Sequence, residues 1–386
     1  MIVAFKRMLA RSDLTILLQR LLSLPTAPFH ESFVFSFLCE ELKKAGVDFL
    51  LDQYGNISAG ALGPECWVAC VAHMDHPGFE IVEGGNEKAV ANWFGGVDAK
   101  YFTGARVVIY NRASGAIRAR GFIKGIARNP QGRVEKMNLR VTGSVEPGDF
   151  GTWDLVPFRR RGDMIFTKGA DDLVGCAVIL VLLKTLKERG MGGVVRGVFT
   201  RAEEQGFIGT LGMIRSGSVS PTTKIISVET SKALAGVVLG GGPVIRLGDR
   251  AGMFHHQMVL FMDYVAKEMK KKNLSFAFQR RVMDGGTCEA TPYQLRGYMA
   301  GGIAVPLHNY HNQGKTRIGA EGVHLKDVEG AVRLLVELAG RMDEFDTPIT
   351  NTLERFETSW QKYGARLQME CQGIKGSKDQ GIKGYK

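Results

Sequence analysis

The spacing of apolar residues along the chain predicts helices that alternate with buried strands. Apolar side chains recur at helical spacing in the segments 14–22, 33–45, 169–187, 207–215, 254–269 and 327–345. Short, nearly continuous apolar runs, which are typical of strands buried on both faces, occupy residues 66–72, 194–200, 224–228 and 301–306. This alternation favours an α/β fold with a mostly parallel sheet covered by helices on both faces.

A different pattern fills residues 79–163. Short alternating runs are separated there by Gly, Asn and Pro, which is typical of a small all-β unit. We therefore predict one α/β domain, built from residues 1–78 and 164–370, with an inserted all-β domain of residues 79–163. Residues 371–386 repeat the segment QGIKG and lack the apolar residues of a core, so we predict a disordered basic tail.

Composition places the chain among ordinary globular proteins. Of its 386 residues, 45% are hydrophobic and 23% are charged. The longest strongly apolar run, Leu173–Leu183, is far shorter than the roughly 20 residues of a membrane helix. The 6 cysteines are too few for a disulfide scaffold. These features favour reduced thiols and a cytoplasmic location, with no membrane partner.

The positive charge is concentrated in one region. The chain carries a net charge of +11, and residues 100–163 alone contain 13 Lys or Arg against 5 Asp or Glu. Such a stretch can bind nucleic acid or an acidic partner. No zinc finger, RNA-recognition sequence or aromatic stacking pattern accompanies it, so we interpret it as a solvated basic face.

Side chains that can bind metals or move protons follow the predicted strands. In open α/β sheets, ligands bind beyond the carboxyl ends of the strands. The candidates are His73 and Asp75, the pair Asp171 and Asp172, the pair Glu203 and Glu204, Glu229, and the loop residues His308 and His311.

Each candidate also has a structural interpretation when it is taken alone. The histidines can be structural or surface residues, the paired aspartates can cap a helix, and the paired glutamates can form a solvated turn. Together they supply nitrogen and oxygen ligands without cysteine. That set suits two borderline cations such as zinc or cobalt.

The order and wording of these motifs resemble the TET-type dinuclear zinc aminopeptidases of the glutamyl aminopeptidase family. The resemblance runs from about residue 14 to residue 345 and rests on segments that include AHMDHPGFEI, GADDLVGCAV, TRAEEQGFIGT, DGGTCEA and IAVPLHNYHN. It implies a zinc-peptidase type of fold and an aminopeptidase that acts on short peptides. It also implies two divalent metal ions, zinc or alternatively cobalt or manganese. Many members of the family are homo-oligomers, and we expect the inserted β domain to support self-association here.

Carried over by position, the resemblance assigns a role to each candidate. It implies that Asp171 bridges the two metals and that the peptide bond from Asp171 to Asp172 is cis. It also implies that Glu203 is the general base and that Asp75 orients His73. The implied metal ligands are His73, Asp171, Glu204, Glu229 and His311.

Five positions depart from the family pattern: His76, Leu173, Glu229, Cys288 and His308. The proposed metal ligands keep the chemical types of the family pattern, whereas several residues expected to face the substrate differ from it. Two alternatives therefore stay open. One is a related carboxypeptidase or N-acyl amino acid amidohydrolase, and the other is a non-catalytic binding protein on the same fold.

Overall fold

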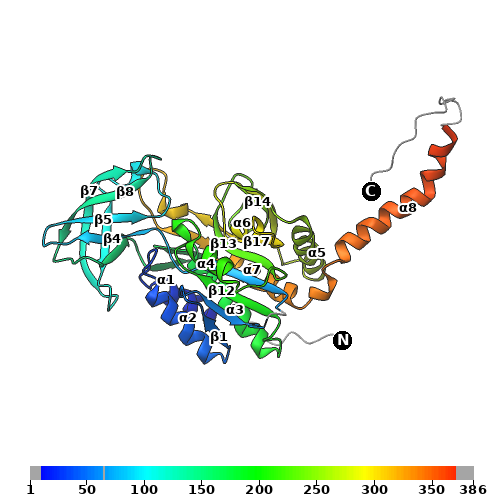
Figure 1. The fold of residues 1–386 in the computed structure, drawn as a ribbon, viewed down its shortest axis with the longest axis horizontal. Helices are drawn as coiled ribbons and strands as arrows, with labels where there is room; N and C mark the ends of the chain where they lie inside the picture. Colours follow the sequence, from blue (N-terminus) through cyan, green and yellow to red (C-terminus); the bar gives the residue numbers. More distant parts are fainter. Residues whose placement is uncertain (1–9, 64–65, 371–386) are drawn as a thin grey trace.

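The protein consists of an α/β body, a β-barrel at one end and a long helix at the other (Figure 1). The structure is a computed structural model that describes residues 10–63 and 66–370. The predicted disordered tail, residues 371–386, lies outside the described residues. No helix among the described residues is long and apolar enough to span a membrane.

The body is organised by a 12-stranded sheet with a parallel centre. Its central strands lie in the order β12 (Val195–Thr200), β3 (Val68–His73), β13 (Lys224–Lys232) and β17 (Ala300–His308), and each is parallel to the next. The other strands are β1 (Phe49–Leu51), β2 (Ile57–Gly60), β10 (Phe158–Arg161), β11 (Met164–Thr167), β14 (Val244–Asp249), β15 (Gly252–Met253), β16 (Gln279–Met283) and β18 (Glu321–His324). Since β3 and β12 are buried throughout, their sequences do not alternate between apolar and polar residues. The one charged residue of β12, Arg196, donates hydrogen bonds to the backbone carbonyls of Ala61, Gly63 and Ser218.

Helices cover both faces of this sheet. The larger core contains side chains of α1 (Arg11–Leu22), α2 (Ser32–Lys44), α3 (Leu173–Glu188) and α7 (Leu325–Ala339). The smaller core contains different side chains of the same central strands. It also includes residues of α4 (Ile208–Ser216) and α6 (Ala290–Gln294). Helix α5 (His256–Lys272) contributes to both. Most of α3 is buried, which explains why its sequence is apolar nearly all round.

The inserted unit is a closed barrel with its own core. Its strands are β4 (Gly78–Glu83), β5 (Lys88–Phe94), β6 (Arg106–Tyr110), β7 (Ile117–Arg128), β8 (Val134–Thr142) and β9 (Phe150–Trp153). Trp93, Phe102 and Trp153 pack against one another inside it. The predicted fold class, an α/β body with a separate small β unit, is confirmed. The large sheet is nevertheless mixed, because antiparallel strands flank its parallel centre on both sides. The exact division at residues 79 and 163 stays a prediction, and β10, within that range, pairs with β11 of the large sheet.

The C-terminal region differs from the helix predicted over residues 327–345. Helix α7 ends at Ala339, a short 3₁₀ turn covers Met342–Glu344, and a further helix, α8, runs over Thr347–Glu370. Gly340 and the turn interrupt the apolar periodicity, so one continuous helix was a wrong prediction.

Candidate metal centre

The parallel strands bring the predicted residues to one edge of the sheet. His73 is the last residue of β3, and its register partner in β12 is Thr200, three residues before Glu203. Glu229 lies in β13, the neighbour of β3 on its other side. Because the carboxyl ends of parallel strands meet at the same edge, residues far apart in the sequence converge there.

The first cluster surrounds the imidazole of His73. Its Nε2 atom lies 3.6 Å from Asp171 Oδ1, 3.5 Å from Glu229 Oε1 and 3.8 Å from Glu203 Oε2. The imidazole is almost fully buried. Burial alone would lower the pKa of His73, but the surrounding carboxylates, Glu203 first, raise it well above its ordinary value.

The second cluster surrounds His311. Its Nε2 atom lies 2.9 Å from Glu204 Oε1 and 3.4 Å from Asp171 Oδ2. Asp171 thus presents one oxygen to each histidine. Burial would raise the pKa of Asp171, but the contacts with His311 and His73 outweigh it and hold that pKa below its usual range. The two clusters share this carboxylate, and the peptide bond from Asp171 to Asp172 is cis, as predicted.

The glutamate pair sits in a turn that Asp75 holds in place. The two carboxylate oxygens of Asp75 accept hydrogen bonds from the backbone N–H groups of Glu203 (3.0 Å) and Glu204 (3.1 Å). Asp75 also contacts His73. Its backbone carbonyl oxygen lies 3.1 Å from His73 Nδ1, and its carboxylate Oδ1 lies 3.5 Å from the same nitrogen. Asp75 therefore contacts the histidine it was expected to orient, and it also fixes the Glu203–Glu204 turn.

Three further residues that the sequence analysis did not assign to the site hold its loops. Glu321 accepts hydrogen bonds from the backbone N–H groups of Ala170 (2.6 Å) and Asp171 (3.2 Å). His76 Nδ1 lies 2.5 Å from the backbone carbonyl of Asp171. Glu31 accepts from the Ala202 N–H and pairs with the Arg201 guanidinium. No short sequence motif marks Glu31 or Glu321; only the fold brings them here.

The loop that carries His311 has an unusual backbone. Asn309, His311 and Asn312 all have positive φ angles, of 57°, 53° and 61°. Such conformations cost free energy in non-glycine residues and concentrate at functional sites. His311 Nδ1 lies 2.7 Å from the carbonyl of Gly96, which follows β5 of the barrel. The imidazole is therefore held at both nitrogens, by Gly96 at Nδ1 and by Glu204 at Nε2.

The remaining departures from the family pattern lie outside the two clusters. His308 is exposed at the end of β17, whereas Leu173 and Cys288 are buried in the two cores. His255 and His256, an adjacent histidine pair, lie at the start of α5. Each of these five residues is absent from the groups of ligand atoms that lie close enough to share an ion among the described residues.

The donor set fits two divalent cations. Ligand atoms of His73, Asp171 and Glu229 lie within 4.8 Å of one another, as do those of Asp171, Glu204 and His311. Asp171 Oδ1 is buried and accepts no hydrogen bond. Burial, together with the carboxylates of Glu204 and Glu229, raises the pKa of Glu203 well above its usual range. So many buried carboxylates near two imidazoles favour the binding of cations.

Lys168 is a buried amine three residues before Asp171, and we expect it to make stability depend on pH. Its Nζ atom lies 3.1 Å from the hydroxyl of Tyr110 in the barrel, and burial lowers its pKa to about 7. The unfolded value is about 10.4, so the unfolded state binds more protons between these two pH values. The free energy of unfolding should then rise with pH by up to about 1.4 kcal/mol per unit in that window.

Unfolding by urea at several pH values between those limits checks this expectation. Lys168→Met should flatten the rise, whereas Lys124→Met, at an exposed position of β7, should retain it. Parallel curves for the wild type and Lys168→Met would show that Lys168 stays protonated in the folded protein.

The fold and the site together define a class of protein: an α/β body whose strand ends carry two histidine–carboxylate clusters beside an inserted barrel. The chain belongs to the M42 glutamyl aminopeptidase family, whose model matches residues 55–334.

Individual relatives agree with this assignment. A protein of Acetivibrio thermocellus, whose name proposes that it is an aminopeptidase, is 25% identical over 84% of this chain and 98% of its own length. Among solved structures, the TET aminopeptidase of Thaumarchaeota archaeon SCGC AB-539-E09 has a TM-score of 0.72 at 20% identity, over 87% of this chain and 99% of its own. The TET1 peptidase of Pyrococcus horikoshii can assemble into a tetrahedron or a large octahedral shell. It has a TM-score of 0.69 at 22% identity, over 84% of this chain and 99% of its own. At these identities the two structures support the fold.

Proposed function

We propose that this protein is a metal-dependent aminopeptidase that removes N-terminal residues from short peptides with the help of two divalent cations. The observation that carries the proposal is the pair of histidine–carboxylate clusters that share Asp171. His73 and Glu229 would hold one cation and His311 and Glu204 the other, with Asp171 common to both. The nitrogen and oxygen ligands favour zinc, with cobalt or manganese as alternatives.

Glu203 is the proposed general base. When bound, the cations would lower the pKa of water and polarise the scissile carbonyl. Glu203 would accept the proton of the attacking water and return it to the leaving amine. Its position supports this task, because Oε2 lies 3.8 Å from His73 Nε2, further than the carboxylate oxygens of Asp171 and Glu229. Asp75 would keep Glu203 in position through the backbone of the turn.

The choice of substrate class separates this function from its alternatives. Hydrolysis of aminoacyl anilides, lost with a chelator and restored by zinc or cobalt, would support an aminopeptidase. Hydrolysis of N-acyl amino acids or C-terminal residues instead would support the related amidohydrolase or carboxypeptidase. Normal metal binding without hydrolysis of any of these would support a binding protein.

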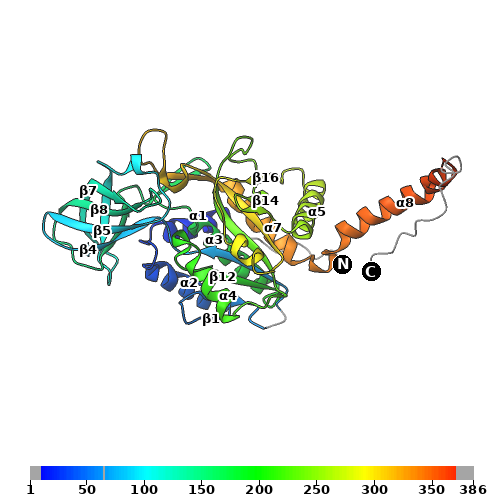
Figure 2. The same ribbon diagram turned by 45° about the horizontal axis from the view of Figure 1, so that its top comes forward.

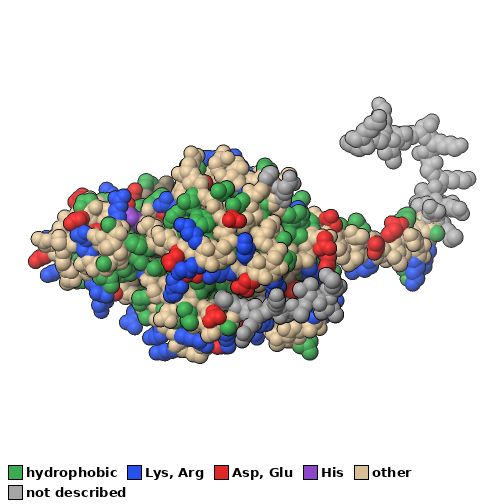
Figure 3. All heavy atoms as spheres, turned by 90° about the horizontal axis from the view of Figure 1, so that it is seen from below, with side chains coloured by type: hydrophobic (Ala, Val, Ile, Leu, Met, Phe, Trp, Pro, Cys, Tyr) green, Lys and Arg blue, Asp and Glu red, His purple; other side chains and the backbone are tan. Residues whose placement is uncertain are grey.

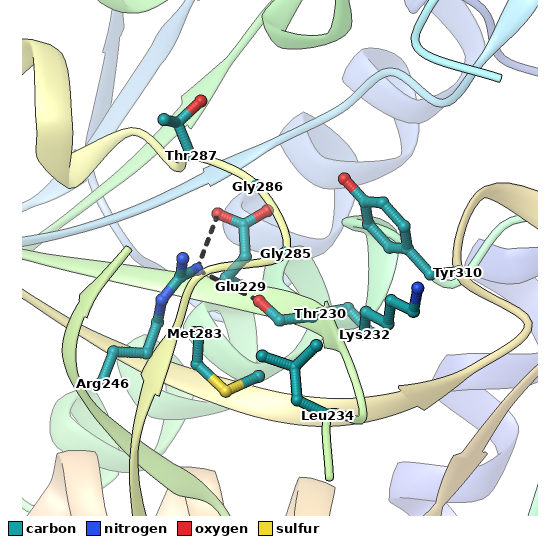
Figure 4. A pocket seen from close by; sticks show the side chains of 11 residues that line it. Glu229, Thr230, Lys232, Leu234, Arg246, Met283, Gly285, Gly286, Thr287 and Tyr310 are labelled. Carbon is teal, nitrogen blue, oxygen red and sulfur yellow. Dashed lines mark hydrogen bonds and ion pairs between the residues drawn. The ribbon is translucent and has the colours of Figure 1, made fainter. Parts of the chain in front are cut away.

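A pocket beside Glu229 is the proposed site for the side chain of the N-terminal residue (Figure 4). Two cationic residues, Arg246 and Lys232, line it. The buried Arg246 guanidinium lies 3.1 Å from Ser231 Oγ and 4.0 Å from Glu229 Oε2, and its Nε has no hydrogen-bond partner. Two cations at a small pocket favour an acidic side chain, which agrees with the glutamyl aminopeptidases for which the family is named.

We expect the ratio of kcat/KM for glutamyl over leucyl anilide to exceed one. Lys232→Met should lower that ratio about tenfold, because it removes a cation that an acidic side chain in the pocket would contact. Lys232 offers none of the ligand atoms that could share an ion in the described part of the chain, so the metal content should not change. The matched control is Lys326→Met, on α7 and away from the pocket. A ratio that is the same in the wild type and Lys232→Met would contradict the assignment of the pocket.

We also propose that the protein is a homo-oligomer and that the barrel contributes to the contact. The barrel lies at one end of the body, and Lys and Arg side chains are spread over it (Figures 1 and 3). Because charges at a contact are screened by salt, the mass measured by light scattering should change with ionic strength. Monomers at every concentration and salt level would contradict this proposal and leave the catalytic one intact.

A further inference from the structure

Helix α8 leaves the body, and along most of its length it contacts no other element of the described part of the chain. It points away from the sheet in both views (Figures 1 and 2). Just before its first turn, Gln257 of α5 donates a hydrogen bond to Asp346. From Leu353 to Leu367, however, every residue except Gly364 is exposed. In proteins most of the stability of a helix comes from packing of its apolar face, so contacts with another molecule would stabilise α8.

The exposed apolar residues of α8 form a narrow stripe. They are Leu353 (60% exposed), Phe356 (58%), Trp360 (58%), Tyr363 (48%) and Leu367 (62%). The steps between them alternate between three and four residues, which are the a and d positions of a heptad repeat. A helix that packs on a globular core presents a wider apolar face. The stripe therefore matches the seam of a coiled coil.

Gly364 allows the indole of Trp360 to lie close to the helix axis. A Cβ atom added at Gly364 would lie 2.9 Å from Cδ2 of the Trp360 indole, so the ring lies flat against the helix at this glycine. Gly364 is also the one buried residue of the segment, covered by that ring. The largest side chain of the stripe thus leaves room for a second helix to approach.

The charges of α8 indicate what the second helix is. Residues 347–370 contain three Glu and three Lys or Arg, although the whole chain carries +11. Both signs are visible along the projecting helix in Figure 3. Nucleic acids and anionic membranes attract segments rich in Lys and Arg, which α8 is not. Two copies of a neutral helix do not repel each other, and each offers the same apolar stripe.

We propose that α8 forms a coiled coil with α8 of a second copy of this chain. The family match ends at residue 334, so this contact lies outside the part of the chain shared with the family and is distinct from the proposed barrel contact. It adds an interaction surface to the proposed function and does not depend on it.

Sedimentation velocity on the full-length protein tests the pairing. Phe356→Lys/Trp360→Lys buries two charges in the seam and should weaken association by about a hundredfold or more. The matched control, Thr358→Lys/Ala365→Lys, places the same charges on the opposite, exposed face and should associate like the wild type. A second seam variant, Tyr363→Ala/Leu367→Ala, adds no charge and should also weaken association.

Hydrogen exchange of the α8 amides separates this contact from the barrel contact. In the wild type, exchange within residues 353–367 should slow as the protein concentration rises, and in the seam variants it should stay fast. Hydrolysis by the metal centre should be the same in all of them, because α8 is remote from it. Concentration-independent exchange, with equal masses for wild type and seam variants, would overturn the proposal. Slow exchange only with anionic phospholipid vesicles would also overturn it, in favour of a membrane surface.

Discussion

Replacing Glu203 with glutamine should lower kcat by about 10²–10⁴-fold while the metal content stays normal. The change keeps the shape of the side chain and removes the carboxylate that is proposed to accept the proton of the attacking water. That loss corresponds to about 3–5 kcal/mol of transition-state stabilisation. Glu203 Oε2 lies at the edge of the His73 cluster, 3.8 Å from Nε2, so the cluster retains closer ligands without it. Steady-state kinetics and elemental analysis of the same preparation measure both quantities.

The neighbouring residue supplies the control. Glu204 Oε1 lies 2.9 Å from His311 Nε2, so Glu204→Gln should lose metal together with activity. If the two glutamates formed only a solvated turn, either change would cost less than about 0.5 kcal/mol of stability and leave turnover unaltered. Near-normal kcat in Glu203→Gln would show that the proposed mechanism is wrong.

Replacing Asp171 with asparagine should have a larger effect, because its two oxygens face two different histidines. They lie 3.6 Å from His73 Nε2 and 3.4 Å from His311 Nε2. Asparagine offers one weaker, uncharged oxygen, so we expect both cations to bind at least about tenfold more weakly and hydrolysis to fall below detection. Asp343→Asn, at an exposed position of the turn after α7, should change neither. Full occupancy by two cations in Asp171→Asn would exclude Asp171 as a shared ligand.

A histidine pair distinguishes a lost ligand from a general loss of stability. His73→Ala should lose metal and activity. His255→Ala, at the start of α5, should retain both, because His255 lies outside the two clusters. Circular dichroism of the two variants shows whether the fold is retained. Equal loss of activity in both would mean that the effect is structural.

The sequence predicted that the candidate residues lie at one edge of the sheet, and the structure brings them together there, because their signal is local. His73, Glu203 and Glu229 each follow or end an apolar run, and parallel strands bring such positions together whatever the details of packing. The buried helix α3 and the strand β3 were predictable for the same reason, since an unbroken apolar run identifies an element buried in the core.

What the sequence did not reveal depends on contacts between distant segments. Glu321 holds the Ala170–Asp171 backbone and Glu31 holds Ala202, but each is a single glutamate in an unremarkable stretch. The positive φ angles of Asn309 and His311 are imposed by the loop in which they lie. Helix α8 is a different case. Its heptad of apolar residues from Leu353 to Leu367 is visible in the sequence and would have predicted a helix beyond residue 345.

Titration of the metal-free protein with zinc, with hydrolysis of a glutamyl anilide measured at each step, tests whether two cations support catalysis. We expect the rate to rise with added zinc and to reach its plateau at about two equivalents per chain, one for each cluster around Asp171. The absence of hydrolysis at every ratio, with cobalt and manganese as well as with zinc, would contradict this expectation.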